Sequence, residues 1–470
     1  MTSAVPPSDR TPTGYLAVLL DRQGIVRPLA WGYAAITLFM VGDGMELGFL
    51  APFLDSRGVG PADVGTLFTV YGLTVAVAAW LAGALAEAVG PRRVMLIGFV
   101  IWAVLEVVFL LGLRAGNFPL MVLAYGIRGF GYPFFAYGFL VWVTLDTPHE
   151  KLGRAVGWYW FASTAGLGVI SAYLAGGLIP IIGELATLWV SLGFVVAGGL
   201  IAALLVHGAG RRRGQGGVRD LGKVVQGLSV VKDHPKVGLG GVVRIINTLS
   251  FYAFGVFLTT HMVREVGFST PAWQTIWGTM LLANIVGNLA SGYLADRIGQ
   301  VTVVAWGGGV GCAVTVLGLY YVPAALGANF AAVITIAALY GLALAAYVPL
   351  SAIMPMLAPR QKASAVAILN LGAGLSNFLG PLLTRVFLGP LGVSGMMWLF
   401  AGIYLVGILP TLALRPPPGP GPPPAERSTA QPGRGPSAGT HDGRPRCAGA
   451  GIHAADSRRG RDTVRHVRRG

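Results

Sequence analysis

Two carboxylates occur in the middle of an apolar run near the start of the chain. In "LFMVGDGMELGFLAPFL", residues 38–54, Asp43 and Glu46 have apolar or small residues on both sides. A carboxylate at the centre of a bilayer costs about 2.5–3.5 kcal/mol on insertion scales, and helical residues three positions apart share a face. The pair therefore predicts a polar cavity between membrane helices, where acids could bind a proton or a polar solute.

Arginines, tyrosines and amides in other apolar runs are candidate partners for these acids. "YGIRGFGYP" places Arg128 three residues after Tyr125 and four before Tyr132, and Arg244 precedes Asn247 by three. Because buried charges need partners, we expect one acid to pair with Arg128 and the other to lie near Arg244. Two acids balanced by two arginines favour a neutral solute, although paired charges can also serve only to lock helices together.

Further polar residues lie inside later apolar runs. Asn370 and Asn377 are two helical turns apart, and Trp160 holds the position equivalent to Asn370 in the first half of the chain. Asparagines in membrane helices also bond neighbouring helices without binding a solute. Glu106 is a fifth ionisable residue inside the apolar runs; it lies toward the outer end of its run, so an alternative is that it simply reaches the outer interface.

Composition identifies the class of protein. Of 470 residues, 54% are hydrophobic and 11% are charged, whereas a soluble domain carries roughly 25% charged residues. We predict an all-α membrane protein of twelve transmembrane helices in two six-helix bundles. The predicted spans are 29–54, 62–86, 93–113, 118–145, 154–179, 185–207, 237–262, 271–295, 301–322, 329–356, 363–388 and 391–414.

The net charge of +15 is distributed as membrane topology requires. The outer loops of the twelve-span arrangement hold only Arg57, Arg114, Arg264 and Arg385, and the inner loops hold most of the other cations of this region. This asymmetry predicts that both termini are cytoplasmic. We therefore expect no nucleic-acid partner, and the two cysteines predict neither a disulfide framework nor a metal site.

The chain divides into two similar halves with polar segments around them. "GALAEAVGPRR" begins at Gly83 and "GYLADRIGQ" begins 209 residues later, which is typical of the parallel repeats of secondary transporters. We predict a cytoplasmic N-terminal segment, an N-terminal bundle, a cytoplasmic linker, a C-terminal bundle and a disordered cytoplasmic tail. Their limits are 1–28, 29–207, 208–236, 237–414 and 415–470.

These two loop segments resemble the motif that proteins of the major facilitator superfamily carry after helices two and eight. The resemblance implies a conformational latch in which glycines allow close packing and an acid meets basic partners. Ala88 replaces a usual arginine and Glu87 replaces an aspartate in the first copy. The matching positions are Gly83, Glu87, Gly90, Arg92 and Arg93, and Gly292, Asp296, Arg297 and Gly299.

Longer segments narrow the resemblance. "WGYAAITLFMVGDGMELGFL", "YGIRGFGYPFFAYGF", "GWYWFASTAGLGV", "VRIINTLSFYAFG" and "ILNLGAGLSNFLGP" are similar to the polyol permeases, the bacterial ribitol and D-arabinitol transporters. The resemblance implies import of a neutral polyol across the bacterial inner membrane, by proton symport with alternating access. It places helices one, four, seven and ten around a central cavity.

We assign roles on this basis. Proton coupling is assigned to Asp43, Glu46 and Arg128. Substrate binding is assigned to Glu46, Tyr125, Tyr132, Trp160, Arg244, Asn247, Asn370 and Asn377. We expect a monomer that contacts a polyol, protons and the lipid bilayer and uses no cofactor.

Other functions stay open on the sequence alone. A facilitator or an efflux carrier would have the same fold, and a sensor would bind a solute without transporting it. We do not expect an enzyme, because no Ser–His–Asp, zinc-spacing or phosphate-loop pattern occurs.

Overall fold

The computed structural model describes Leu20, residues 22–206 and residues 230–415. The elements of these ranges are helical, and seven helical stretches are long and apolar enough to cross a membrane. The prediction of an all-helical membrane protein is confirmed, whereas the count of twelve spans stays a prediction. The segments 1–19, 207–229 and 416–470 lie outside the described residues, so the expectations for the linker and the tail are not tested.

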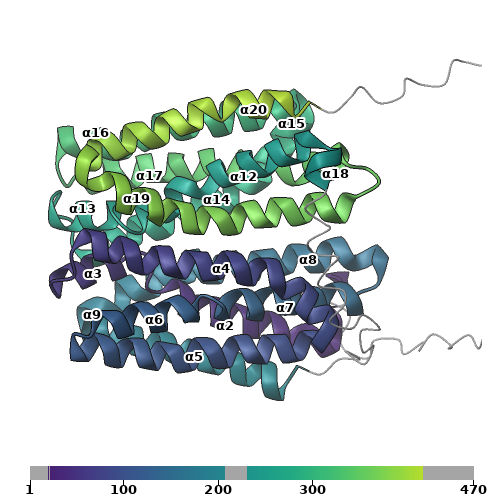
Figure 1. Ribbon diagram of the computed structural model, residues 1–470, viewed down its shortest axis with the longest axis horizontal. Helices are drawn as coiled ribbons and strands as arrows, with labels where there is room; N and C mark the ends of the chain where they lie inside the picture. Colours follow the sequence, from purple (N-terminus) through teal and green to yellow (C-terminus); the bar gives the residue numbers. More distant parts are fainter. Residues whose placement is uncertain (1–19, 21, 207–229, 416–470) are drawn as a thin grey trace, which may run out of the picture. The chain divides into compact units, whose positions relative to one another are not determined.

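The first half of the chain forms one group of helices (Figure 1). A short 3-10 turn, Arg27–Leu29, leads into it. Its helices are α2 (Ala30–Gly44), α3 (Leu50–Ser56), α4 (Pro61–Val89), α5 (Pro91–Ala115), α6 (Phe118–Arg128), α7 (Gly131–Asp146), α8 (His149–Thr164) and α9 (Ser171–Leu204), with a π-helical turn at Ala165–Ile170.

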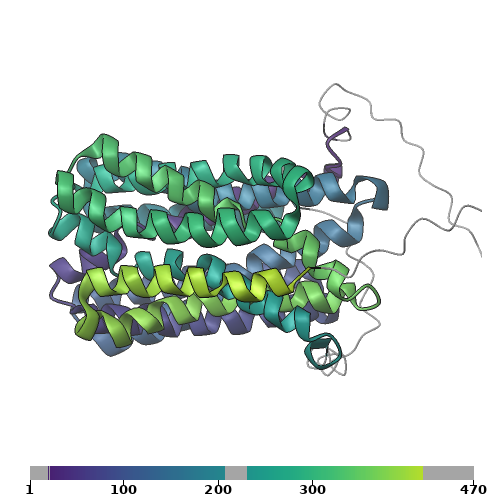
Figure 2. The same cartoon turned by 90° about the horizontal axis from the view of Figure 1, so that it is seen from above.

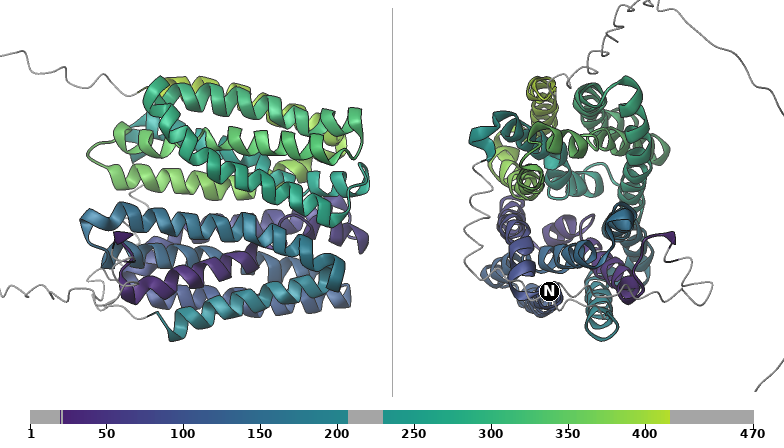
Figure 3. Two further views of the ribbon diagram at one scale, coloured as in Figure 1. Left: turned by 180° about the vertical axis from the view of Figure 1, so that it is seen from behind. Right: turned by 90° about the vertical axis from the view of Figure 1, so that its right-hand side faces the viewer.

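The second half forms another group, drawn from teal to yellow-green (Figures 1 and 3). Figure 2 shows that the long helices of both groups run side by side. The helices are α11 (Val230–Asp233), α12 (Pro235–Phe254), α13 (Leu258–Arg264), α14 (Thr270–Ile298), α15 (Gln300–Thr302), α16 (Gly311–Leu326), α17 (Phe330–Ala345), α18 (Leu350–Leu357), α19 (Lys362–Val406) and α20 (Ile408–Ala413), with a π-helical turn at Val303–Val310.

Four of the predicted spans are interrupted within their length. The first, fourth, seventh and tenth break at residues 45–49, 129–130, 255–257 and 346–349. These are the spans that the family resemblance places around the central cavity. Irregular backbone at membrane depth occurs only where it is buried in protein or lines a cavity, and such breaks are typical of binding sites in transporters.

Two long helices each change direction at a glycine. Gly183 in α9 has φ 79° and Gly392 in α19 has φ 64°, both outside the helical range. Residues with a Cβ rarely adopt a positive φ, whereas glycine does so at little cost. Gly183 and Gly392 are separated by the same 209 residues as the repeated segments; Gly183 lies between two predicted spans, and Gly392 lies at the start of the predicted span 391–414.

The two halves contact each other along several helices. α4 packs against α19, α9 packs against α14, and α3 packs against α13. Near α3 and α13, Arg264 Nε lies 3.3 Å from Asp55 Oδ2. Arg385 Nε donates to Thr66 Oγ1 over 2.7 Å. These polar contacts join the halves at one end of the helices.

We predict that Gly341→Ala destabilises the second half. A Cβ at Gly341 of α17 would lie 2.0 Å from the Met280 carbonyl oxygen of α14, and overpacking of this kind costs about 1–3 kcal/mol. The midpoint of thermal unfolding in detergent should fall. Gly402→Ala is the matched control, because a Cβ there meets nothing within 4 Å; equal midpoints for the two variants would contradict the packing argument.

Candidate functional site

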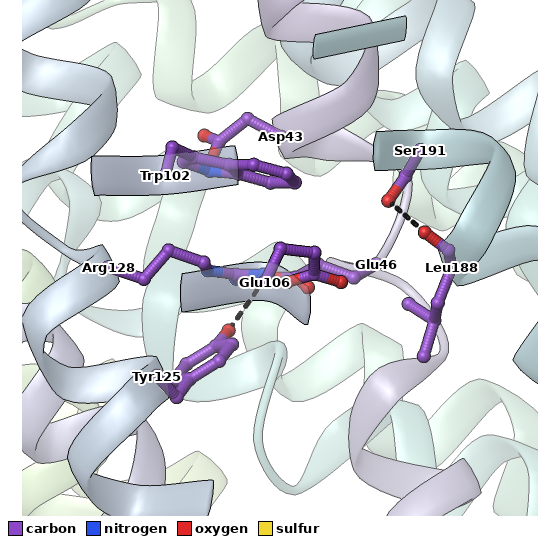
Figure 4. Close-up of polar contacts among 8 residues, drawn as sticks. All are labelled: Asp43, Glu46, Trp102, Glu106, Tyr125, Arg128, Leu188 and Ser191. Atoms are coloured by element: carbon purple, nitrogen blue, oxygen red, sulfur yellow. Dashed lines mark hydrogen bonds and ion pairs between the residues drawn. The ribbon is translucent and has the colours of Figure 1, made fainter. Parts of the chain in front are cut away.

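Arg128 binds two carboxylates from different elements. Its Nη1 donates to Glu106 Oε2, from α5, and its Nη2 donates to Glu46 Oε1, from the break between α2 and α3. Tyr125 OH donates to the same Glu46 oxygen over 2.8 Å. Figure 4 shows the side chains of Arg128, Glu46 and Glu106 converging inside the first half. Charge-assisted bonds of this kind fix geometry strongly.

The guanidinium of Arg128 is enclosed by aromatic rings. Arg128 Cζ lies 4.3 Å from the ring centroid of Tyr125, 4.7 Å from Trp102, 5.6 Å from Tyr71 and 5.9 Å from Phe109. The Arg128 side chain is 0% exposed, and cation–π contacts strengthen when water is excluded. Arg128 is also the last residue of α6, where the helix dipole favours a positive charge.

The structure decides between the alternatives for Glu106. It does not reach the outer interface, because it is 0% exposed and bonded to Arg128. Trp102 lies one helical turn before Glu106 on α5 and also contacts Arg128. The spacing of four residues between Trp102 and Glu106 was the available signal, since it places an indole and an acid on one helix face.

Asp43 has a different partner from Glu46. Its Oδ1 accepts a 2.6 Å hydrogen bond from Trp102 Nε1, and Tyr71 lies beside it. The two acids do not lie in one helix, although their spacing had suggested a shared helix face. α2 ends at Gly44, so Glu46 lies in the irregular segment 45–49, which turns its side chain toward Arg128 and leaves Asp43 outside the ion pairs.

Arg244 does not pair with the remaining acid, which corrects a second expectation. Its Nη1 donates to Asn247 Oδ1, as the spacing of three residues allows, and Asn247 Nδ2 donates to the Leu344 carbonyl over 3.4 Å. In the described ranges no carboxylate forms an ion pair with Arg244. Tyr252 and Tyr137 lie near its guanidinium instead.

Tyrosines connect the surroundings of Asp43 with those of Arg244. Tyr252 of α12 lies near both residues and beside Asn377 of α19. The predicted residue Tyr132 lies near Asp43 and Tyr252. Sequence analysis did not single out Tyr252, although Tyr252 follows Arg244 by eight residues and so shares its face of α12. The result is a hydroxyl-rich region contributed by both halves.

The core of the second half contains a chain of neutral hydrogen bonds. Tyr404 OH donates to the Asn247 carbonyl over 3.0 Å. Ser250 Oγ lies 2.7 Å from both Tyr404 OH and Tyr340 OH. Because a phenol has one proton, Ser250 must donate to Tyr404 and Tyr340 to Ser250. This chain of hydrogen bonds holds the backbone of Asn247 in place.

Two other predicted binding residues lie apart from these groups. Trp160 is 42% exposed and its ring contacts Tyr159. Asn370 is exposed on α19. No hydrogen bond joins either side chain to Asp43, Arg128 or Arg244 among the described residues. Their roles stay predictions.

The predicted latch shares its backbone geometry between the halves. Gly90 and Gly299 end α4 and α14 with φ 102° and 95°. Arg92 Nη2 donates to the Ala203 carbonyl over 2.6 Å, and Arg297 stacks on the Tyr293 ring.

The structure describes the side chain of only one of the two acids of the predicted latch. In the described part of the chain Asp296 forms no ion pair, and the side chain of Glu87 lies outside the described residues. The remaining predicted positions, Gly83, Arg93 and Gly292, keep their assignment as predictions. The latch itself therefore stays a prediction.

Comparison with known proteins decides the family. The model of the Major Facilitator Superfamily matches residues 32–238 and 240–459. The chain belongs to this superfamily. It is a multi-pass membrane transporter, as the loop motifs predicted. The crystal structure of the nucleoside transporter NupG has the same fold, with a TM-score of 0.67 and 14% identity over 83% of this chain and 99% of NupG.

Three bacterial carriers are similar to most of the chain. The alpha-ketoglutarate permease of Bacillus subtilis (strain 168) is 40% identical over 390 residues, which cover 82% of this chain and 89% of that protein. The D-arabinitol transporter and the ribitol transporter of Klebsiella pneumoniae are each 37% identical over 387 residues, 82% of this chain and 91% of theirs. These relatives are transporters, which confirms that a carrier and not an enzyme was the correct prediction.

We predict that Arg128→Met strongly destabilises the protein. The change leaves Glu46 and Glu106 buried without a cation, and breaking a buried ion pair costs about 3–5 kcal/mol. The thermal unfolding midpoint of purified protein in detergent should fall well below that of Arg114→Met, which removes an exposed arginine at the end of α5. Similar midpoints would mean that Arg128 does not hold the two acids.

Proposed function

We propose that the protein imports a neutral polyol of the ribitol or D-arabinitol class by proton symport. The observation that supports a polyol substrate is the compensated charge of the first half. Arg128 is bonded to two acids and offers no free cation to an anionic solute. The hydroxyl-rich region of Tyr132, Tyr252 and Asn377 then supplies donors and acceptors for hydroxyl groups. The two polyol transporters among the relatives support the same substrate class.

The proposal includes a topology. Twelve spans with both termini in the cytoplasm of a bacterium agree with the kinks at Gly183 and Gly392, each of which would join two spans at the outer surface. The contacts of Arg264 with Asp55 and of Arg385 with Thr66 would then close the outer end. We expect the monomer to be the transporting unit.

The proposed transport cycle is alternating access. A proton from outside binds Asp43, whose carboxylate accepts a hydrogen bond from the indole N–H of Trp102, and a polyol binds between the halves. The halves then rock about the central region and open inward. Glu46 stays paired with Arg128, whereas Asp43 lies outside the ion pairs and is available to a proton.

The first test is uptake by proteoliposomes. Radiolabelled ribitol and D-arabinitol are offered with and without an inward proton gradient, with the membrane potential collapsed. We expect the gradient to drive accumulation. Asp43→Asn should lower the accumulation that a given gradient drives but keep equilibrium exchange, because the amide cannot bind and release a proton. Flux that ignores the gradient in the wild type would make the protein a facilitator.

Arg244 supports a second candidate substrate. Its guanidinium has an amide and tyrosines beside it in place of an acid, which suits a carboxylate. The relative named alpha-ketoglutarate permease points to the same class. A 2-oxo dicarboxylate is therefore the rival to the polyol.

Competition distinguishes the two classes. For a polyol carrier, excess 2-oxoglutarate should leave ribitol uptake unchanged. Arg244→Gln should then raise the KM for ribitol by roughly tenfold, the equivalent of one hydrogen bond to a charged group at about 1.5 kcal/mol. Uptake of labelled 2-oxoglutarate that Arg244→Gln abolishes, with no ribitol uptake in the wild type, would instead select the dicarboxylate.

A further inference from the structure

Three carboxyl groups share a single cation in the first half. Asp43, Glu46 and Glu106 are 4%, 3% and 0% exposed, and Arg128 is 0% exposed. If all three acids were ionised, the cluster would hold two more negative charges than positive ones. An uncompensated buried charge costs several kcal/mol even after relaxation, so the buried cluster favours the uptake of two protons.

Hydrogen bonds indicate which acid stays ionised. Glu46 accepts from both Tyr125 OH and Arg128, and donors stabilise a carboxylate. Glu106 accepts only from Arg128, and its Oε1 is buried with no partner in the described structure. A neutral acid with one unpaired oxygen costs less than a carboxylate in the same position. Glu46 and Arg128 therefore form the neutral pair, and Glu106 is left as an acid.

We propose that Glu106 binds a second coupling proton, so that two protons enter with each solute. The inference rests on the proposed function, in which Asp43 binds the first proton. The proton comes from the outer aqueous phase and forms an O–H bond at Glu106 Oε1. It leaves to the cytoplasm when the opposite state of the cycle admits water, which stabilises the carboxylate.

The charged groups facing Glu106 are few. Arg128 comes from α6, Asp43 from α2 and Glu46 from the break after α2. Tyr125 and Tyr71 complete the surroundings through their contacts with Arg128. The proton at Glu106 is thus governed by the same guanidinium that holds Glu46.

The test measures stoichiometry at equilibrium. Proteoliposomes with the membrane potential clamped at zero accumulate labelled ribitol at several imposed pH differences. Two coupled protons give about 100-fold accumulation for one pH unit and one proton gives about tenfold, because each tenfold ratio equals about 1.4 kcal/mol. We expect a slope of two for the wild type and one for Glu106→Gln. Glu265→Gln, the same change at an exposed site, should keep a slope of two.

The slope separates coupling from structural damage. A variant that is merely damaged reaches equilibrium more slowly but keeps the wild-type slope, so a slope of two in Glu106→Gln would overturn the proposal. A wild-type slope of one would overturn it while leaving proton symport intact. A wild-type slope of zero would overturn proton symport itself and this proposal with it.

A second measurement needs no transported solute. Infrared spectra of the wild type should contain the C=O stretching band of a protonated carboxyl group that disappears in Glu106→Gln and persists in Glu265→Gln. Identical carboxyl bands in folded wild type and Glu106→Gln would overturn the proposal, also in the event that ribitol is not transported.

Discussion

The hydrogen bonds of Arg128 with Glu46 and Glu106 are the constraint on which the first half depends. One guanidinium holds the end of α6, the middle of α5 and the irregular segment between α2 and α3. With no water available, any arrangement that separates these elements leaves a charge unpaired. The interaction therefore selects one relative placement of the three segments, even though ion pairs of this kind add little net stability compared with apolar packing.

The helical class and the repeated halves of the fold could be predicted, because hydropathy and the internal sequence repeat indicate them directly. The position of Gly183 between two predicted spans follows from apolar length, and the 209-residue repeat relates Gly392 to it. The importance of Arg128 followed from the cost of burying a charge. The partner of Arg128 was only half predicted: Glu46 was one of two candidates, and Glu106 was not among them. Hydropathy fixes the depth of a residue in the bilayer, but it does not fix the direction in which the helix turns it.

The interruption at residues 45–49 was the other feature that sequence patterns did not reveal. The segment contains no proline, and its apolar residues continue the hydrophobic run. Its conformation is held by contacts from distant elements: Arg128 and Tyr125 bind Glu46, and Gln274 of α14 donates to the Met45 carbonyl over 3.5 Å. Tertiary interactions of this kind override local helix preference, and they connect the acid of the first half with a helix of the second.

The two halves of the duplicated fold differ in the chemistry of their cores. In the second half, the core contains the hydroxyl chain of Tyr340, Ser250 and Tyr404. Serine and tyrosine hydroxyls are neutral throughout the physiological pH range, so the core of the second half has the same electrical state in acid and in neutral surroundings. The core of the first half is built from carboxyl groups and a guanidinium. Acidification therefore acts on the core of the first repeat and leaves the hydroxyl chain of the second unchanged, so this chain can serve as a fixed frame against which the responsive repeat moves.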